Sequence, residues 1–132
     1  MTSARPPGPG GRILVIDDDV EIGRVLKRSL RGHDVVAVSS GRAALDLLAT
    51  GVTFDVILCD LVMPGLGGPD VHQALQKTMP ELCERMIFMS GGAFTPGAEA
   101  FARTTTCTLV NKPFDMKAIR ALVAERVAGR AQ

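Results

Sequence analysis

The stretch from residue 13 to residue 19, ILVIDDD, takes four large apolar residues directly into three aspartates. The apolar run predicts a buried strand, and the carboxylates would then gather where that strand ends. A further aspartate, Asp60, follows a second apolar run, and Lys112 comes shortly after another. Carboxylates that are held close together raise one another's pKa, so they require a compensating positive charge nearby.

The residue types at these strand ends are suited to phosphoryl transfer. Oxygen ligands from Asp17, Asp18 and Asp60, with no His or Cys ligand among them, favour Mg²⁺ or a similar ion such as Mn²⁺. Lys112 would supply a movable ammonium group and Ser90 a hydroxyl donor. A carboxylate nucleophile beside a divalent cation, an ammonium and a hydroxyl can accept a phosphoryl group and stabilise its oxygens.

The elements that position these residues follow from the alternation of short apolar runs with stretches of helical period. Five runs fit strands, and several are continuous, as in strands covered on both faces: 12–16, 34–38, 54–59, 85–89 and 108–110. Helical spacing or strong helix formers occur at 22–30, 41–49, 71–75 and 119–127. Five strands alternating with five helices predict an α/β fold with a parallel, doubly wound sheet and helices on both faces.

In such a sheet, side chains from different strands converge only at the carboxyl ends of the strands. Each candidate also has a purely structural interpretation. Asp18 and Glu21 could form a capping box, Asp60 could begin a loop, Ser90 could lie in a turn, and Lys112 could be a solvated side chain. Their joint placement after four strands, on one edge of the sheet, favours a shared function over four separate structural ones.

Composition sets limits on the remaining possibilities. The chain has 132 residues and 46% hydrophobic content, which suits one domain over 12–129, preceded by a flexible arm or linker over 1–11. A formal charge of +1 argues against nucleic acid or a membrane surface as a direct partner. No apolar run is long enough to span a membrane, and three scattered cysteines indicate reduced thiols and a cytoplasmic location. His33 and His72 are isolated, which predicts surface positions.

Four motifs, in this order, resemble the receiver domain of bacterial response regulators: ILVIDDD, VILCDLVMPGLGG, IFMSGG and NKPF. Ser90 comes 30 residues after Asp60, and Lys112 comes 22 after Ser90. The resemblance extends from Arg12 to about Val127. It implies a (βα)5 flavodoxin-like three-layer sandwich with strand order 2-1-3-4-5.

The resemblance also implies a role for each matching residue. Asp60 would be the phosphoacceptor, with a sensor histidine kinase or a histidine phosphotransfer protein as donor. Its metal would be held by the carboxylates of Asp17, Asp18 and Asp60 and by the backbone carbonyl of Val62. Ser90 and Lys112 would contact the phosphoryl group, Asp19 would cap a helix, and the Lys112–Pro113 bond would be cis. Such a domain is a phosphoacceptor switch that promotes its own phosphorylation and dephosphorylation, and is not a conventional enzyme.

One position departs from the family pattern. Receivers often carry an aromatic residue three positions before the lysine, whereas this chain has Leu109 there and contains neither Tyr nor Trp. An aromatic rotamer switch at position 109 is therefore excluded. The route by which activation reaches the surface stays open.

Other readings of the same residues are weaker. A phosphohydrolase of the haloacid dehalogenase type would use Asp17 as nucleophile and Asp19 as acid/base, but its motif requires Thr or Val where Glu21 stands, and Asp60 would have no role. A flavodoxin-like nucleotide binder would bring its phosphate against Asp17–Asp19, which would repel it. A pure interaction module would not need the intact set of charges. Similarity to receivers of hybrid sensor histidine kinases suggests such a parent protein.

Overall fold

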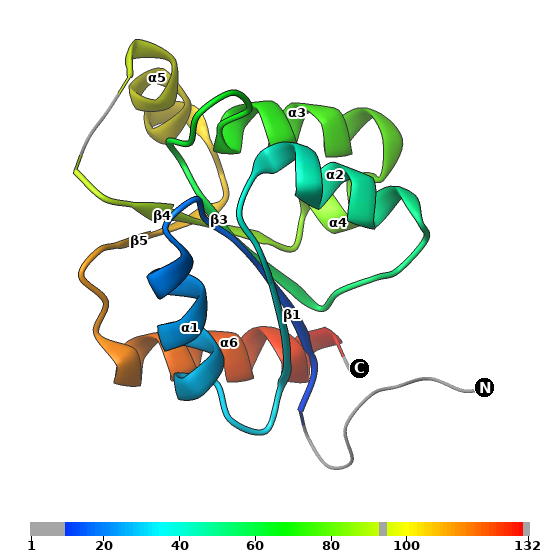
Figure 1. Cartoon of the computed structure of the whole chain (residues 1–132), viewed down its shortest axis with the longest axis vertical. Helices are drawn as coiled ribbons and strands as arrows, with labels where there is room; N and C mark the ends of the chain where they lie inside the picture. Colours follow the sequence, from blue (N-terminus) through cyan, green and yellow to red (C-terminus); the bar gives the residue numbers. More distant parts are fainter. Residues whose placement is uncertain (1–9, 93–94, 131–132) are drawn as a thin grey trace.

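A computed structural model describes residues 10–92 and 95–130 (Figure 1). Its centre is a parallel sheet in the order β2-β1-β3-β4-β5. The strands are β1 (Arg12–Ile16), β2 (Asp34–Val38), β3 (Val56–Asp60), β4 (Met86–Ser90) and β5 (Thr108–Asn111). This is the doubly wound, three-layer fold that the sequence predicts.

Six helices connect or follow the strands within the described residues, one more than predicted. They are α1 (Val20–Ser29), α2 (Gly41–Ala49), α3 (Gly68–Thr78), α4 (Pro80–Cys83), α5 (Pro96–Thr104) and α6 (Met116–Arg130). The unpredicted helix, α4, is a single turn that begins with Pro80 and is separated from the end of α3 by one residue. A turn of four residues is too short to show a helical period, and this is why the pattern of apolar residues does not reveal it.

Helices cover both faces of the sheet, and each face has its own core. α1 and α6 pack on one face with the first core, which includes Ile13, Val15, Leu58 and Ile119. The other four helices cover the opposite face with the second core, which includes Leu14, Cys59, Phe88 and Leu75. Strands β3 and β4 are buried along their whole length, because both of their faces and both of their edges are covered.

The start of β3 differs from the prediction, which included Phe54 and Asp55 in the strand. Asp55 instead precedes the strand and is buried, where its carboxylate accepts a hydrogen bond from the Arg12 N–H at 2.8 Å. The same carboxylate lies 3.8 Å from the guanidinium of Arg130 in α6. Asp55 therefore joins the start of β1 to the last helix, α6. This junction lies at the amino ends of the strands, opposite the predicted site.

The predicted arm over 1–11 falls mostly outside the described residues, which begin at Gly10. Gly11 itself is buried, and its N–H donates a hydrogen bond to His33 Nδ1 at 3.0 Å. His33 and His72, which the sequence predicts at the surface, are both half-buried. Among the described residues, no helix has the length and apolar character needed to cross a bilayer.

Gly68 provides a test of this packing. A Cβ at Gly68 would lie 2.7 Å from the backbone oxygen of Asp60 and 3.1 Å from Phe88, whereas a Cβ at Gly97 in α5 would meet nothing within 4 Å. We expect Gly68→Ala to lower the free energy of unfolding by about 1–3 kcal/mol, since backbone atoms would have to move. Gly97→Ala should leave it unchanged or raise it by up to about 1 kcal/mol, since alanine favours helix. Urea unfolding of both variants measures the difference; equal stabilities would contradict this packing.

Candidate functional site

The acidic residues meet at the carboxyl ends of β1 and β3. Ile16 pairs with Cys59 across these neighbouring strands, so the residues that follow, Asp17 and Asp60, lie side by side. One carboxylate oxygen from each of Asp17, Asp18 and Asp60 lies within 4.8 Å of the others. Asp17 and Asp60 are buried, while Asp18 is exposed.

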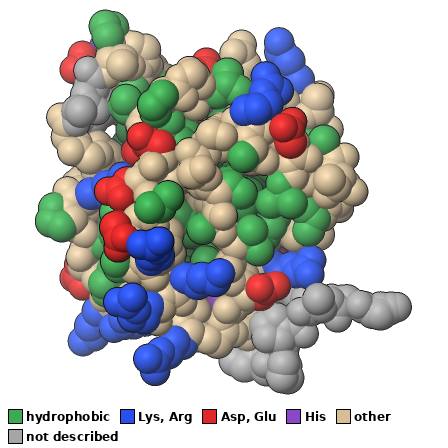
Figure 2. Space-filling model, viewed as in Figure 1, with side chains coloured by type: hydrophobic (Ala, Val, Ile, Leu, Met, Phe, Trp, Pro, Cys, Tyr) green, Lys and Arg blue, Asp and Glu red, His purple; other side chains and the backbone are tan. Residues whose placement is uncertain are grey.

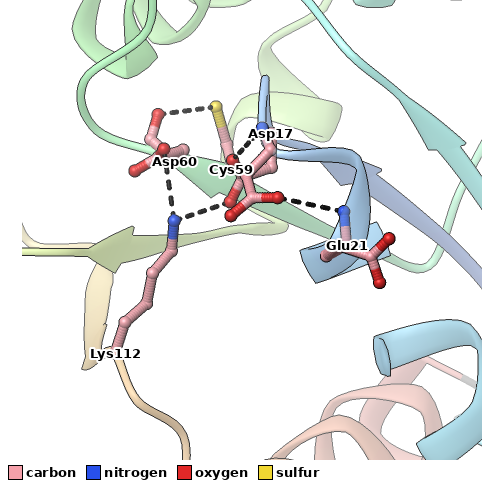
Figure 3. Close-up of polar contacts among 6 residues, drawn as sticks. Asp17, Glu21, Cys59, Asp60 and Lys112 are labelled. Atoms are coloured by element: carbon pink, nitrogen blue, oxygen red, sulfur yellow. Dashed lines mark hydrogen bonds and ion pairs between the residues drawn. The ribbon is translucent and has the colours of Figure 1, made fainter. Parts of the chain in front are cut away.

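Lys112 brings a positive charge to this cluster from the end of β5, two strands away from β3. Its Nζ lies 2.7 Å from Asp17 Oδ2 and 3.3 Å from Asp60 Oδ2, so one ammonium contacts both buried carboxylates (Figure 3). The lysine follows β5, and its own N–H donates to the backbone oxygen of Ser90 at 2.8 Å. The Lys112–Pro113 bond is cis, the isomer that the family resemblance implies.

The three consecutive aspartates have different positions in the structure. Asp19 is the N-cap of α1, and its carboxylate accepts the Glu21 N–H at 3.0 Å. Asp17 Oδ1 accepts the Asp19 N–H at 2.9 Å, which orients the Asp17 side chain. The prediction that Asp19 caps the helix is confirmed, and the alternative in which Asp18 is the cap is wrong. Asp18 therefore keeps its carboxylate for other contacts.

Three further residues border Asp60. The backbone of Val62 is hydrogen-bonded to the Asp60 side chain and stabilises its charged form. Ser90 ends the neighbouring strand β4 and is buried. The third is Gly68, whose closeness to the Asp60 backbone was not foreseen from the sequence; the Gly-Leu-Gly-Gly run after Pro64 is its only sequence signal.

The pKa values of Asp60 and Lys112 are both raised, for different reasons. Burial, together with the neighbouring Asp17 carboxylate, raises the pKa of Asp60 to about 6, against the opposing effect of Lys112 and the Val62 backbone. Burial alone would lower the pKa of Lys112, but its contacts with Asp17 and Asp60 raise it overall. Lys112 is therefore charged at neutral pH, and one ammonium does not fully compensate the carboxylates around it.

Cys59 does not contribute a nucleophile. It is fully buried, and its Sγ donates to the backbone oxygen of Asp60 at 3.4 Å. Burial and the two neighbouring carboxylates raise the pKa of the thiol far above its usual range. Because only the thiolate is reactive, this cysteine is an inert part of the core.

The arrangement of donors suits a hard divalent cation. Three carboxylates within 4.8 Å of one another offer only oxygen ligands, and such sets are typical of Mg²⁺ or Mn²⁺ sites. The exposed position of Asp18 leaves one side open to solvent. A phosphate oxygen approaching from that side would meet the cation, Lys112 and Asp60 together.

The raised pKa of Asp60 predicts that the free energy of unfolding of the metal-free protein depends on pH. Between the unfolded value near 3.8 and about 6, the folded state binds more protons, so stability falls as pH rises through this range. We expect Asp60→Asn to be more stable than wild type at pH 7.5 by about 1–2 kcal/mol, with the gap closing near pH 4. Denaturant unfolding in a chelator measures this. Asp46→Asn, at an exposed site on α2, is the control; a pH-independent gap would refute the prediction.

Comparison with known proteins agrees with this geometry. Residues 13–124 match the family model described as the response regulator receiver domain. The chain is similar to the sensor kinase CckA of Brucella abortus, with 34% identity over 119 residues that make up 86% of this chain and 12% of that protein. It is also 31% identical to the response regulator protein FleR of Pseudomonas aeruginosa over 121 residues, or 90% of this chain and 25% of that protein.

Solved structures show the same likeness. The receiver domain of the Francisella response regulator 1452 has a TM-score of 0.76 and 25% identity, covering 93% of this chain and all of that one. A structure described as adenylate cyclase from Rhodopirellula baltica has the same TM-score with 28% identity, covering 90% of this chain and 88% of that one. No comparison supports the haloacid dehalogenase alternative. From the acidic cluster, the lysine across the sheet and these matches, the chain belongs to the receiver domain family of two-component phosphorelays.

Proposed function

We propose that Asp60 accepts a phosphoryl group from the phosphohistidine of a sensor histidine kinase or a histidine phosphotransfer protein. The observation that carries this proposal is the shared contact of Lys112 with Asp17 and Asp60 beside the exposed Asp18. In the step itself, an Asp60 carboxylate oxygen attacks phosphorus and forms an O–P bond. The N–P bond breaks, and its electron pair returns to the imidazole nitrogen of the donor.

The metal ligands would be the carboxylates of Asp17, Asp18 and Asp60 and the backbone carbonyl of Val62. A bound Mg²⁺ or Mn²⁺ would supply a Lewis acid that neutralises charge on the phosphoryl oxygens. Lys112 would add a second positive charge and Ser90 a hydrogen-bond donor to these oxygens. The Asp19 N–H holds Asp17 in place through its 2.9 Å hydrogen bond, which supports the ligand geometry before any cation binds.

The same groups would promote the reaction with a small phosphodonor and the later hydrolysis of the acyl phosphate. Both reactions place charge on phosphoryl oxygens in the transition state. Stabilisation of that charge by Lys112 and the cation therefore acts in both directions. The domain would be a switch with a limited lifetime, and its phosphorylated form would change a contact with a protein effector.

The surface around the site favours a protein donor. Lys and Arg side chains gather over α1, next to the acidic residues at the start of that helix (Figure 2). The exposed basic residues of α1 are Arg24, Lys27 and Arg28. Both signs of charge lie close to Asp60, which suits a partner with a mixed surface more than a nucleic acid or a membrane.

The chain spans an eighth to a quarter of the length of the sensor kinase and response regulator described above. Receivers therefore occur within longer proteins of both kinds. We propose that this domain acts as the receiver of a hybrid sensor histidine kinase in the cytoplasm. The similarity to CckA supports this context.

Phosphorylation of single variants tests the role of Asp60. With acetyl phosphate and Mg²⁺, we expect wild type to gain the mass of one phosphoryl group and Asp60→Asn to gain none. Asp17→Asn should still be labelled, but roughly 10–100-fold more slowly, since it loses a group that orients the site. Intact-protein mass spectrometry follows the reaction. Label that persists in Asp60→Asn and disappears in Asp17→Asn would make Asp17 the nucleophile.

A measurement of cation binding distinguishes the proposed role of Asp18 from that of its neighbour Asp19. We expect Mg²⁺ to raise the melting temperature of wild type, because a ligand that binds only the folded state stabilises it. Asp18→Ala should lose this increase. Asp19→Ala should be less stable by about 1 kcal/mol through loss of the helix cap, yet should keep the increase. Calorimetry with and without Mg²⁺ decides; an unchanged increase in Asp18→Ala would remove Asp18 from the ligand set.

A further inference from the structure

Because position 109 holds a leucine, a change at the site must reach the surface by a route other than an aromatic residue on β5. The structure offers such a route. Leu109 lies on β5 with 38% of its surface exposed, and no aromatic residue lies in that strand. Across β4 and β5, Phe88 is paired with Leu109, and it belongs to a group of three rings that touch one another. They are His72 of α3, Phe88 of β4 and Phe101 of α5, and we call them the aromatic triad.

Close ring contacts join the three elements of the aromatic triad. Phe88 and Phe101 meet edge to face, with centroids 4.9 Å apart and planes at 77°. The His72 ring lies 5.2 Å from Phe101 and 5.9 Å from Phe88. These distances lie within the range of favourable aromatic pairs, and such pairs have preferred angles. A displacement of one ring therefore changes the contacts of the other two.

Phe88 connects the triad to the phosphorylation site by two paths. It lies two residues before Ser90 on β4, and alternate residues of a strand share a face. Its ring also packs under Gly68, whose missing Cβ would lie 3.1 Å from Phe88 and 2.7 Å from the backbone oxygen of Asp60. Phe88 is fully buried, so it cannot move without moving its neighbours.

Phe101 connects the triad to a helix that is otherwise lightly held. The sequence of α5, PGAEAFART, contains a single large apolar side chain, that of Phe101. Only Ala98 of this helix is buried, and its neighbours Phe101 and Ala102 are half-buried. The position of α5 on the sheet therefore depends mainly on how Phe101 packs between Phe88 and His72.

We propose that the aromatic triad relays phosphorylation of Asp60 to the interface between α3 and α5. This inference rests on the proposed function, since it requires Ser90 and the Asp60 loop to shift when the phosphoryl group arrives. The shift of the β4 end moves Phe88, Phe88 displaces Phe101, and Phe101 changes its contact with His72. The outcome is a second position of α5 against α3, set by a packed cluster and not by a rotamer on β5.

The surface that this movement would change is a groove between α3 and α5. It has a volume of 420 Å³, and His72 and Phe101 line it together with Gln73, Gln76 and Thr105. Two of the three rings therefore border solvent. Burial lowers the pKa of His72, which favours the neutral form of its ring, and its NMR signals therefore report on the packing of the triad.

The experiment uses the full chain with Mg²⁺ and beryllium fluoride as a phosphoryl mimic. Amide NMR shifts report on Ser90, Lys112 and α5, and the His72 ring signals report on the triad. Incorporated 3-fluorophenylalanine adds a signal for each of the five Phe residues. We expect the mimic to shift Ser90, Lys112, His72, Phe88, Phe101 and the α5 amides. Phe54, buried just before the start of β3 and away from the site, should not respond.

Two variants interrupt the route, and one serves as a control. In Phe101→Leu and in His72→Leu, each of which removes a ring and leaves an apolar side chain, we expect the α5 shifts to fall below about half of the wild-type change while the Ser90 and Lys112 shifts remain. Phe114→Leu makes the same substitution at another half-buried Phe, in the core under α1 and α6. It should leave the α5 response intact.

The possible failures are distinguishable. A full α5 response in both Phe101→Leu and His72→Leu would overturn the relay while leaving the proposed function in place. Unchanged His72 and Phe101 signals in a wild type whose α5 amides shift would also overturn it. If the mimic shifts neither Ser90 nor Lys112 in wild type, the proposed function itself fails, and the relay with it.

Discussion

The main constraint on this structure is that carboxylates which repel one another are held together at one edge of the sheet. Asp17 and Asp60 are buried within contact of a single ammonium, and Asp18 lies beside them. Lys112 alone does not balance three carboxylates, and burial, together with the charge of Asp17, raises the pKa of Asp60 in spite of the lysine. Such a cluster persists in a folded protein because its cost is offset elsewhere, here by two extensive cores on the faces of the sheet.

Strand order explains how residues from distant parts of the chain reach this cluster. β1 and β3 are direct neighbours, and this places Asp17 next to Asp60. Lys112 comes from β5 and must pass the end of β4, where its N–H is held by the Ser90 backbone. Asp60, the proposed phosphoacceptor, and its charged neighbours therefore lie at strand ends with little freedom, as a preorganised site requires.

The parts of the fold that the sequence predicts are those with a repeated or continuous pattern. The run at 12–16 and the helix former at 41–49 appear as β1 and α2 with the same bounds. The sequence places Asp55 in a strand because it lies within an apolar run. Its actual position depends on a hydrogen bond from the Arg12 N–H, 43 residues away, which no local pattern indicates. The burial of His72 likewise depends on Phe88 and Phe101, which only tertiary packing brings to it. The types of the site residues could be predicted because each ends a strand, but their charge balance could not, since it depends on distances.

Rigidity and mobility are divided between the site and its surroundings. The carboxylates and Lys112 lie at the ends of buried strands, whereas α5 has one buried residue and one large apolar contact. An element so lightly held can have two positions that differ little in free energy, and a small change at its contact then selects between them. The absence of an aromatic residue at position 109 does not remove this property, because Phe101 holds the helix through its contacts with Phe88 and His72. In the proposed relay, the well-packed contact between Phe88 and Phe101 joins the site to one lightly packed helix.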